Sequence, residues 1–463
     1  MKNKIKASLV LLSFMLLLFP IYSFAETGIT TNVTFKYVKE DQKVLENIPE
    51  IGCKAVYIAE PNTGKVIYEK NAYEKMFPAS TTKILTALVV LERCDLSEVT
   101  TVSKHAIELI PEGYSNASLK VGEELDIKTL LQALLIPSAN EAGNVLAEHV
   151  SGSIEEFVEL CNKRAKELGC ETLHFTNTNG IHDENHYCSA YDLYLIAKEC
   201  RKFDVFNEIV SSQTFTLPAT NVYSKADRTF KSTNELLHQG KYYYAYCNGI
   251  KTGHTTPAGE CFVGSSSYNN LDFISVVLGG KTSNSKGFNE RFYDTKQLFE
   301  YSYNNYAIKD ITEQGELGAK LKIGKATKET AFVGAIVDTT ISTIVPNYLN
   351  KENIISSIAI NENIVAPIKK DEVLGTITYN ADGLVYTTNL IASHSVDKLP
   401  YEVYNSIVVG VLFLTFILFI VLFKKCKRKI IAIIMILLIA TAEGFAIYYI
   451  VQEGMANSIT KII

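Results

Sequence analysis

Apolar and polar residues alternate in short runs near the start of the chain, and apolar residues then recur at helical spacing. Two β-rich runs, 55–60 and 65–69, flank a turn at 61–64 and predict a hairpin. Pro78 marks a helix start, and residues 84–91 behind it are apolar on nearly every side. A helix with this pattern is expected to be buried.

A block of helical patterns follows, and strand patterns return after it. The predicted helices cover 127–136, 140–150, 154–168 and 190–202, and the predicted strands cover 261–267 and 272–279. Strands, then helices, then strands again indicate an α+β domain whose first and last strands share one sheet flanked by helices. We assign residues 45–305 to this domain.

Residues 306–400 are rich in strand patterns and predict a separate, small β-rich domain. Its clearest element is a hairpin, in which the runs 376–379 and 384–388 flank the turn Asn380-Ala381-Asp382-Gly383.

The amino terminus has the pattern of an export signal. Lysines at positions 2, 4 and 6 precede an apolar run over 7–20, and the small residue Ala25 ends the segment. We predict a signal peptide over 1–25, cleaved after Ala25, with an uncleaved anchor as the alternative. The polar residues 26–44 are expected to form a linker.

Two apolar runs near the carboxyl terminus, 406–423 and 430–451, are each long enough to span a bilayer as a helix. The loop 424–429 between them is basic, and the positive-inside rule places it in the cytoplasm. This topology predicts an exported protein that is anchored in the cytoplasmic membrane, with residues 45–400 on the outer face.

Composition narrows the picture further. The 463 residues suit two domains plus targeting segments, and a formal net charge of -5 gives no reason to expect a nucleic-acid partner. Nine cysteines occur without a C-x-x-C pair or a zinc-binding pattern. Disulfides and free buried thiols both remain open.

Three short motifs occur in an order that indicates one active site. They are Ser80-Thr81-Thr82-Lys83 at the start of the apolar helix, Ser138-Ala139-Asn140, and Lys251-Thr252-Gly253. S-x-x-K, a second serine motif and K-T-G together are the signature of penicillin-binding proteins and class A β-lactamases, in which the first serine is an acyl-transfer nucleophile. Each motif alone would be weak evidence, whereas the ordered set is strong.

The residue types fit this chemistry. Ser80 needs a base, and Lys83 lies one helical turn away on the same face. Burial and a second cation, for which Lys251 is the candidate, would hold Lys83 in its neutral form. An oxyanion would be bound by backbone N–H groups near Ser80 and at His254. In the alternative interpretation, Ser80 caps a helix and Lys83 lies at the surface.

Beyond the motifs, residues 45–395 resemble low-molecular-mass penicillin-binding proteins of the D-alanyl-D-alanine carboxypeptidase type. The similar segments are Pro78 to Lys83, Ser138 to Ala142, Phe175-Thr176-Asn177 with Gly180, His186 and Asp192, and Gly249 to Thr255. The resemblance implies a serine β-lactamase/penicillin-binding-protein-like catalytic fold, with a central antiparallel sheet, that removes terminal D-alanine from peptidoglycan stem pentapeptides through a Ser80 acyl-enzyme. It also implies inhibition by β-lactam antibiotics and no cofactor.

The same resemblance implies roles for the remaining residues. Ser138 would relay a proton to the leaving amine and Asn140 would orient the substrate amide. Lys251 and Thr252, with Gly253 beside them, would hold the terminal carboxylate. Arg291 is a further candidate for the carboxylate, with an ordinary surface arginine as the alternative.

A short run rich in histidine allows a metal-binding interpretation beside a structural one. The run 182–186 contains two histidines and two acidic residues, which could bind a metal, but a structural role is favoured and no metal is expected.

A β-lactamase would need a deacylating glutamate motif, which Glu171-Thr172-Leu173-His174 matches poorly. The three motifs would also suit a D,D-endopeptidase or a penicillin-sensing membrane protein.

Overall fold

The computed structural model describes residues 32–34, 48–398 and 461–462, together with a few positions between 410 and 444. The predicted signal peptide and the basic loop 424–429 lie outside these residues, and so do most positions of the predicted linker and of the two predicted membrane spans. Within the described residues, no helix is both long and apolar enough to cross a bilayer.

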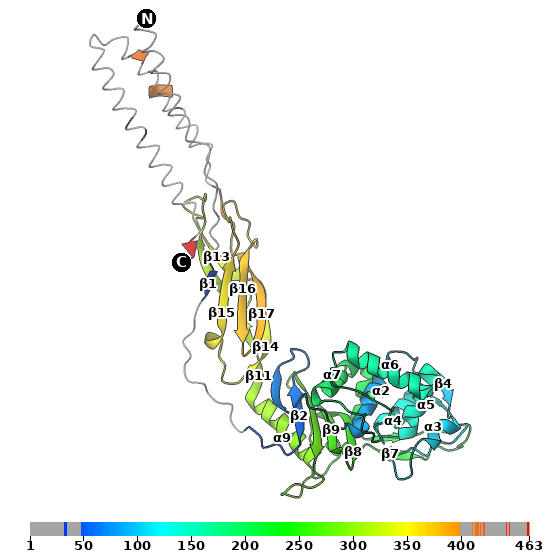
Figure 1. The fold of residues 1–463 in the computed structure, drawn as a ribbon. Coiled ribbons are helices and arrows are strands. Elements are labelled where there is room, and N and C mark those ends of the chain that lie inside the picture. The colour runs from blue at the N-terminus through cyan, green and yellow to red at the C-terminus, as the bar shows by residue number, and fades with distance from the viewer. Residues whose placement is uncertain are drawn as a thin grey trace. The chain divides into compact units, whose positions relative to one another are not determined.

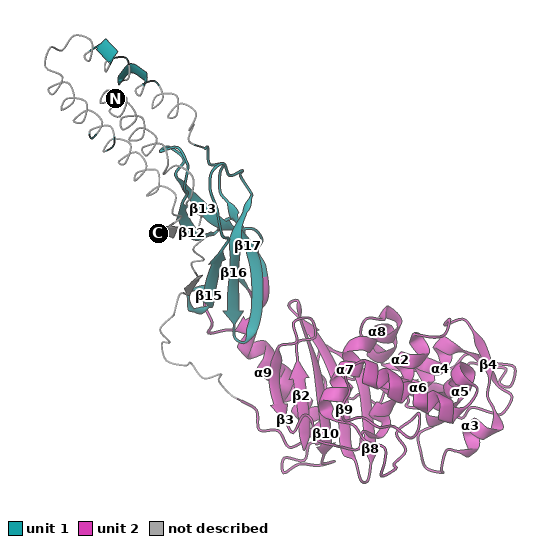
Figure 2. Cartoon of the chain, turned by 45° about the horizontal axis from the view of Figure 1, so that its top comes forward, with its two compact units in different colours: residues 1–38, 310–341, 351–463 teal, residues 39–309, 342–350 magenta. Residues whose placement is uncertain are grey.

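The chain divides into two compact units, which Figure 2 colours separately. The α+β unit comprises residues 39–309 and 342–350, and the β unit comprises residues 1–38, 310–341 and 351–463.

An antiparallel five-stranded sheet forms the centre of the α+β unit, in the order β3-β2-β10-β9-β8. Its strands are β2 (Ala55–Ala59), β3 (Val66–Lys70), β8 (Cys247–Thr255), β9 (Gly259–Tyr268) and β10 (Leu271–Gly280). The predicted amino-terminal hairpin and the late strands therefore share one sheet. β8 is an edge strand, so no strand of the described residues pairs with its outer side.

Helices pack on this sheet and on one another (Figure 1). They are η1 (Ala79–Thr82), α2 (Lys83–Leu91), α3 (Lys104–Glu108), α4 (Ile127–Leu135), α5 (Asn140–Ser151), α6 (Ile154–Glu167), α7 (Ala190–Cys200), α8 (Asp204–Ser211) and α9 (Glu290–Asn305). Helix α2 is buried from Lys83 to Val90, as its all-round apolar pattern predicts, and it packs against α4, α5, α6 and α7. The hydrophobic core of the unit therefore lies around α2.

Six further strands of the described residues form three separate two-stranded sheets. They form the pairs β4 (Val99–Thr101) with β5 (Glu124–Asp126), β6 (Thr214–Thr216) with β7 (Thr229–Lys231), and β11 (Tyr306–Thr312) with β14 (Ile341–Pro346).

The β unit is built on a seven-stranded antiparallel sheet in the order β1-β15-β16-β17-β13-β12-β18. Its strands are β1 (Asn32–Thr34), β12 (Leu317–Lys322), β13 (Phe332–Val337), β15 (Ile355–Ile360), β16 (Val373–Ala381), β17 (Leu384–Ala392) and β18 (Lys461–Ile462). The predicted hairpin is the β16–β17 pair at the middle of this sheet. The prediction of an α+β domain followed by an all-β domain is confirmed.

Candidate active site

Ser80 and Lys83 lie at the start of the buried helix. Ser80 belongs to the 3₁₀ turn η1 and is half-buried, and Lys83 is the first residue of α2 and is fully buried. The Lys83 Nζ donates hydrogen bonds to the Ser80 Oγ at 3.0 Å, to the Asn140 Oδ1 at 2.7 Å and to the Asn179 carbonyl oxygen at 2.7 Å. Three oxygen atoms therefore hold the Lys83 nitrogen beside the serine hydroxyl.

The surroundings of Lys83 favour its neutral form. Burial lowers the pKa of Lys83 well below its usual value, and the charge of Lys251 lowers it further, while Glu141 acts in the opposite direction. A neutral amine one hydrogen bond from a hydroxyl can accept its proton. The surface-lysine interpretation is therefore excluded for Lys83.

The backbone is strained at the residue before Ser80 and at Ser138. Ala79 has φ 48° and Ser138 has φ 69°, values that residues with a side chain rarely adopt and that cost roughly 1–3 kcal/mol each. Ala79 directly precedes Ser80, and Ser138 lies two residues before α5. Strain at these two positions is part of how the fold aims both serine side chains into one cavity.

Asn140 connects Lys83 to a loop on the far side of the site. Its Oδ1 accepts from Lys83, its Nδ2 donates to the Ser115 carbonyl oxygen at 2.8 Å, and its backbone N–H donates to the same oxygen at 3.0 Å. Because Asn140 is the first residue of α5, the helix start holds its amide in place.

Two glycines allow other segments to approach the Ser80 turn closely. A Cβ on Gly253 would lie 2.8 Å from the Pro78 carbonyl oxygen and 3.0 Å from the Ser80 nitrogen. A Cβ on Gly180 would lie 1.8 Å from the Ala79 carbonyl oxygen. The glycine of the K-T-G motif is thus required because strand β8 passes directly beside the nucleophile turn.

Lys251 and Thr252 have different environments on β8. The Lys251 Nζ is buried and donates to the Thr252 carbonyl oxygen at 3.0 Å, and burial together with the charge of Arg291 lowers the pKa of Lys251 to about 7. The Thr252 hydroxyl lies on the open side and forms a hydrogen bond with the Thr233 hydroxyl at 2.5 Å. Of the two side chains, Thr252 is the one that reaches the cavity.

Arg291 is the cation that borders the cavity on this side. It lies in the first turn of α9, its Nη1 donates to the Gly253 carbonyl oxygen at 3.1 Å, and the same nitrogen lies 2.7 Å from a Glu260 oxygen. The Nδ1 of His254 lies 3.2 Å from the other Glu260 oxygen. Arg291 is therefore part of the β8 wall and is not an isolated surface arginine.

A cavity of about 610 Å³ joins these groups. It is lined by Ser80, Glu112, Gly113, Tyr114, Ser115, Ser138, Asn140, Gly180, Ile181, His182, Thr233, Thr252, Gly253, His254, Thr255, Thr256, Pro257 and Arg291. Both serines of the motifs and the open side of β8 thus face one space, which is large enough for a peptide end.

His186, one of the two histidines of the run 182–186, is held by protein groups on both sides of its ring. The His186 Nδ1 accepts from the Thr176 N–H at 3.0 Å, and its Nε2 lies 2.8 Å from the Thr82 Oγ1. Burial lowers the pKa of His186 to about 3, so the ring is neutral, and it stacks on Phe175. Since both ring nitrogens are bound to protein groups, this histidine has no atom left for a metal.

Four further residues support the site, and only two of them, Glu141 and Asn177, lie in the family-like segments of the sequence. Thr233 reaches Thr252 from a loop after β7, and Asn179 contributes only a backbone carbonyl oxygen to Lys83. Glu141 is buried next to Asn140 and accepts from the Ala117 N–H at 2.7 Å. Asn177 was part of the family-like segment in the sequence, and its Oδ1 holds the Gly180 N–H at 2.7 Å.

Two protein-family models match the chain. The model for D-alanyl-D-alanine carboxypeptidase matches residues 42–282, and the model for the carboxyl-terminal domain of penicillin-binding protein 5 matches residues 306–398.

Individual relatives agree with these matches. The D-alanyl-D-alanine carboxypeptidase DacF of Bacillus subtilis is 32% identical over 364 residues, which cover 77% of this chain and 88% of DacF. The crystal structure of penicillin-binding protein 5 from Haemophilus influenzae superposes with a TM-score of 0.57 at 25% identity, over 76% of this chain and 99% of that chain. The crystal structure of PBP3 from Streptococcus pneumoniae, a peptidoglycan synthesis regulatory factor, superposes with a TM-score of 0.57 at 26% identity. The match covers 75% of this chain and 100% of that chain.

Proposed function

Because the chain belongs to the D-alanyl-D-alanine carboxypeptidase family, we propose that it removes the terminal D-alanine from peptidoglycan stem pentapeptides through an acyl-enzyme on Ser80. The observation that carries this proposal is the fully buried Lys83 amine, 3.0 Å from the Ser80 hydroxyl at the edge of an open cavity. A serine with a preorganised base is the arrangement that acyl transfer requires.

Acylation begins when Lys83 accepts the Ser80 proton and the Ser80 Oγ attacks the carbonyl carbon of the penultimate D-alanine. The oxyanion that forms is bound by the backbone N–H groups of Ser80 and His254. Gly253 supports this assignment because it lets β8 pass within contact distance of the Ser80 turn. Donors fixed in place before the reaction are typically worth roughly 10² to 10³ in rate each.

Ser138 passes the proton to the leaving amine. Its hydroxyl lines the cavity together with that of Ser80, and its strained backbone supports a functional reason for its orientation. Departure of D-alanine leaves an ester on Ser80, and a water molecule that loses its proton to the same base then hydrolyses it.

The terminal carboxylate of the substrate is bound by the Thr252 hydroxyl and the Arg291 guanidinium, which both line the cavity. Lys251 contributes through its charge from behind the strand, because its ammonium is buried against the Thr252 carbonyl oxygen. Asn140 orients the substrate amide from the opposite wall.

A β-lactam resembles the acyl-D-alanyl-D-alanine end and acylates the same serine. The alternative, a β-lactamase, needs a glutamate that directs water at the ester. Glu171, which comes nearest to that motif in the sequence, is exposed and does not line the cavity.

The experiment that tests the proposal is the reaction of the purified chain with a labelled penicillin, followed by peptide mapping. We expect a stable adduct on Ser80 that is released slowly. Rapid turnover of penicillin would favour the β-lactamase, and an adduct on another residue would refute the assignment of the nucleophile.

The site works outside the cell in this proposal. The basic, apolar and small-residue pattern of residues 1–25 and the apolar runs 406–423 and 430–451 support export and anchoring in the cytoplasmic membrane. External protease should therefore digest residues 45–400 in cells stripped of their wall. Protection of these residues in intact protoplasts would refute the topology.

A further inference from the structure

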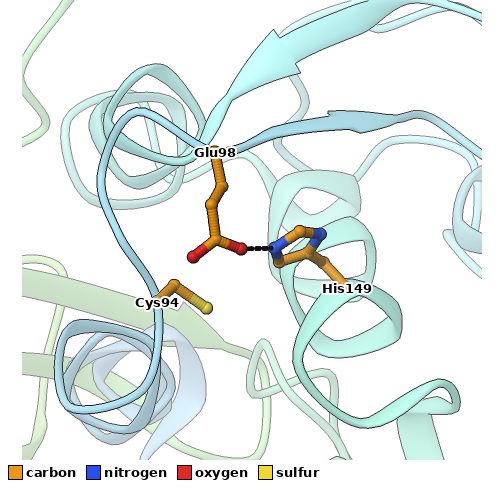
Figure 3. A group of neighbouring side chains, drawn as sticks. All are labelled: Cys94, Glu98 and His149. Carbon is orange, nitrogen blue, oxygen red and sulfur yellow. Dashed lines mark hydrogen bonds and ion pairs between the residues drawn. The ribbon is translucent and has the colours of Figure 1, made fainter.

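A second group of reactive side chains lies at the far ends of the two helices that begin at the active site. Helix α2 begins at Lys83 and is followed by Cys94, and helix α5 begins at Asn140 and carries His149 in its last turn. Glu98 lies between them, just before β4. Figure 3 shows the three side chains pointing to a common centre.

The distances suit a shared ion. The Cys94 Sγ, a Glu98 carboxylate oxygen and a His149 ring nitrogen all lie within 4.8 Å of one another. The Glu98 Oε2 and the His149 Nε2 are 2.9 Å apart. Ligand atoms in a tetrahedral zinc site are about 3.5 Å apart, given metal–ligand bonds of about 2.0–2.3 Å. Small side-chain rotations would therefore bring all three atoms to bonding distance of one metal.

Two of the ligand atoms, Glu98 Oε2 and His149 Nε2, share a hydrogen bond in the metal-free chain, and a bound metal would replace that bond. The Glu98 Oε1 accepts the Asp95 N–H at 2.7 Å, which orients the carboxylate and leaves Oε2 directed at the centre. Within the described part of the chain, the Cys94 Sγ takes part in no hydrogen bond. Its thiol is half-buried, so it is shielded without being closed off from solvent.

We propose that Cys94, Glu98 and His149 form a binding site for a divalent transition metal, with Zn²⁺ as the preferred ion and water as the fourth ligand. A thiolate, an imidazole and a carboxylate are the donors that zinc takes, whereas Ca²⁺ and Mg²⁺ require a shell of oxygen atoms. On binding, the thiol releases its proton to solvent and its sulfur donates an electron pair to the metal, while the neutral His149 ring carries its proton on Nδ1 so that Nε2 and the Glu98 Oε2 are free to donate electron pairs too.

Metal binding would cross-link two helices of the α+β unit. The metal would join the carboxyl-terminal ends of α2 and α5, about 12–14 Å along each axis from Lys83 and Asn140. Because those two residues share a hydrogen bond, the metal would fix the helix pair at the end opposite the catalytic contact. This site is separate from the proposed peptidase chemistry and does not depend on it.

The test is a Co²⁺ titration of the purified, metal-free full chain, followed by displacement with Zn²⁺. We expect one Co²⁺ per chain with a thiolate-to-cobalt absorption band. Zn²⁺ at about 100 times its dissociation constant should raise the melting temperature by about 5 °C.

Matched variants locate the site. Cys94→Ser should abolish the band, and Glu98→Gln and His149→Asn should weaken binding. Cys247→Ser, which alters another half-buried thiol, and His105→Asn, which alters an exposed histidine, should retain it. Circular dichroism shows that each variant is folded, and the two weaker variants remain informative if Cys94→Ser does not fold. Absence of the band in the wild type, or its persistence in Cys94→Ser, would overturn the proposal.

Discussion

Replacing Lys83 by methionine separates the chemical role of this residue from its structural role. Methionine keeps most of the buried volume and removes the amine. The change leaves Ser80 without its base and leaves the Asn140 Oδ1 and the Asn179 carbonyl oxygen without their shared donor.

The expected loss of activity follows from the distance between base and nucleophile. A general base placed at hydrogen-bond distance contributes typically about 10² to 10⁴ in rate. With the amine 3.0 Å from the Ser80 Oγ, Lys83→Met should slow acylation by at least about 10². The oxyanion donors are backbone groups, so their contribution should remain.

The expected change in stability is small because two effects oppose each other. Each orphaned acceptor costs about 1–3 kcal/mol. Burial lowers the pKa of the Lys83 amine far below its usual value, which shows that burying this group is unfavourable. Removing the amine therefore also removes its desolvation penalty. We therefore expect a change of no more than about 3 kcal/mol in the free energy of unfolding, against a large kinetic effect.

The assay is the rate of penicillin acylation under single-turnover conditions, measured together with urea unfolding of the same sample. Lys104→Met is the control, since Lys104 is an exposed lysine paired with Glu108. Acylation by folded Lys83→Met at a rate within tenfold of the wild type would refute the role of Lys83 as base.

Three further predictions test other parts of the site. Gly253→Ala would place a Cβ 2.8 Å from the Pro78 carbonyl oxygen and should slow acylation by about 10², measured as above. Arg291→Gln should raise KM for a D-alanyl-D-alanine peptide by about tenfold or more with a smaller change in kcat, and an unchanged KM would exclude carboxylate binding. Between pH 6.5 and about 3, His186 binds a proton in the unfolded chain but not in the folded chain, where burial lowers its pKa to about 3. The free energy of unfolding should therefore fall as the pH falls, by up to about 1.4 kcal/mol per pH unit. In His186→Gln, urea unfolding should show a weaker dependence of this free energy on pH.

Regular spacing explains which parts of the molecule could be predicted. Ser80 and Lys83 are three residues apart, so one helical turn brings them together whatever else the chain does. The apolar pattern behind Pro78 predicted that α2 is buried, and the β-rich run 384–388 beside the turn at 380–383 predicted β17. These features depend on local periodicity, which a sequence displays directly.

Features that depend on long-range packing could not be predicted. No motif indicates the left-handed φ angles of Ala79 and Ser138, or the close approach of Gly180 and Gly253 to the Ser80 turn from segments far along the chain. The contact of Thr233 with Thr252 and the backbone bond from Lys83 to Asn179 join residues whose types are common and whose spacing is arbitrary. The motifs likewise could not show that the Lys251 ammonium turns back to its own strand.

The most direct measurement of the central claim is the release of D-alanine from a stem pentapeptide by the purified chain and by its Ser80→Ala variant. The account predicts one D-alanine per peptide cleaved by the wild type and none by the variant. Absence of D-alanine release by the folded wild type, or equal release by folded Ser80→Ala, would contradict it.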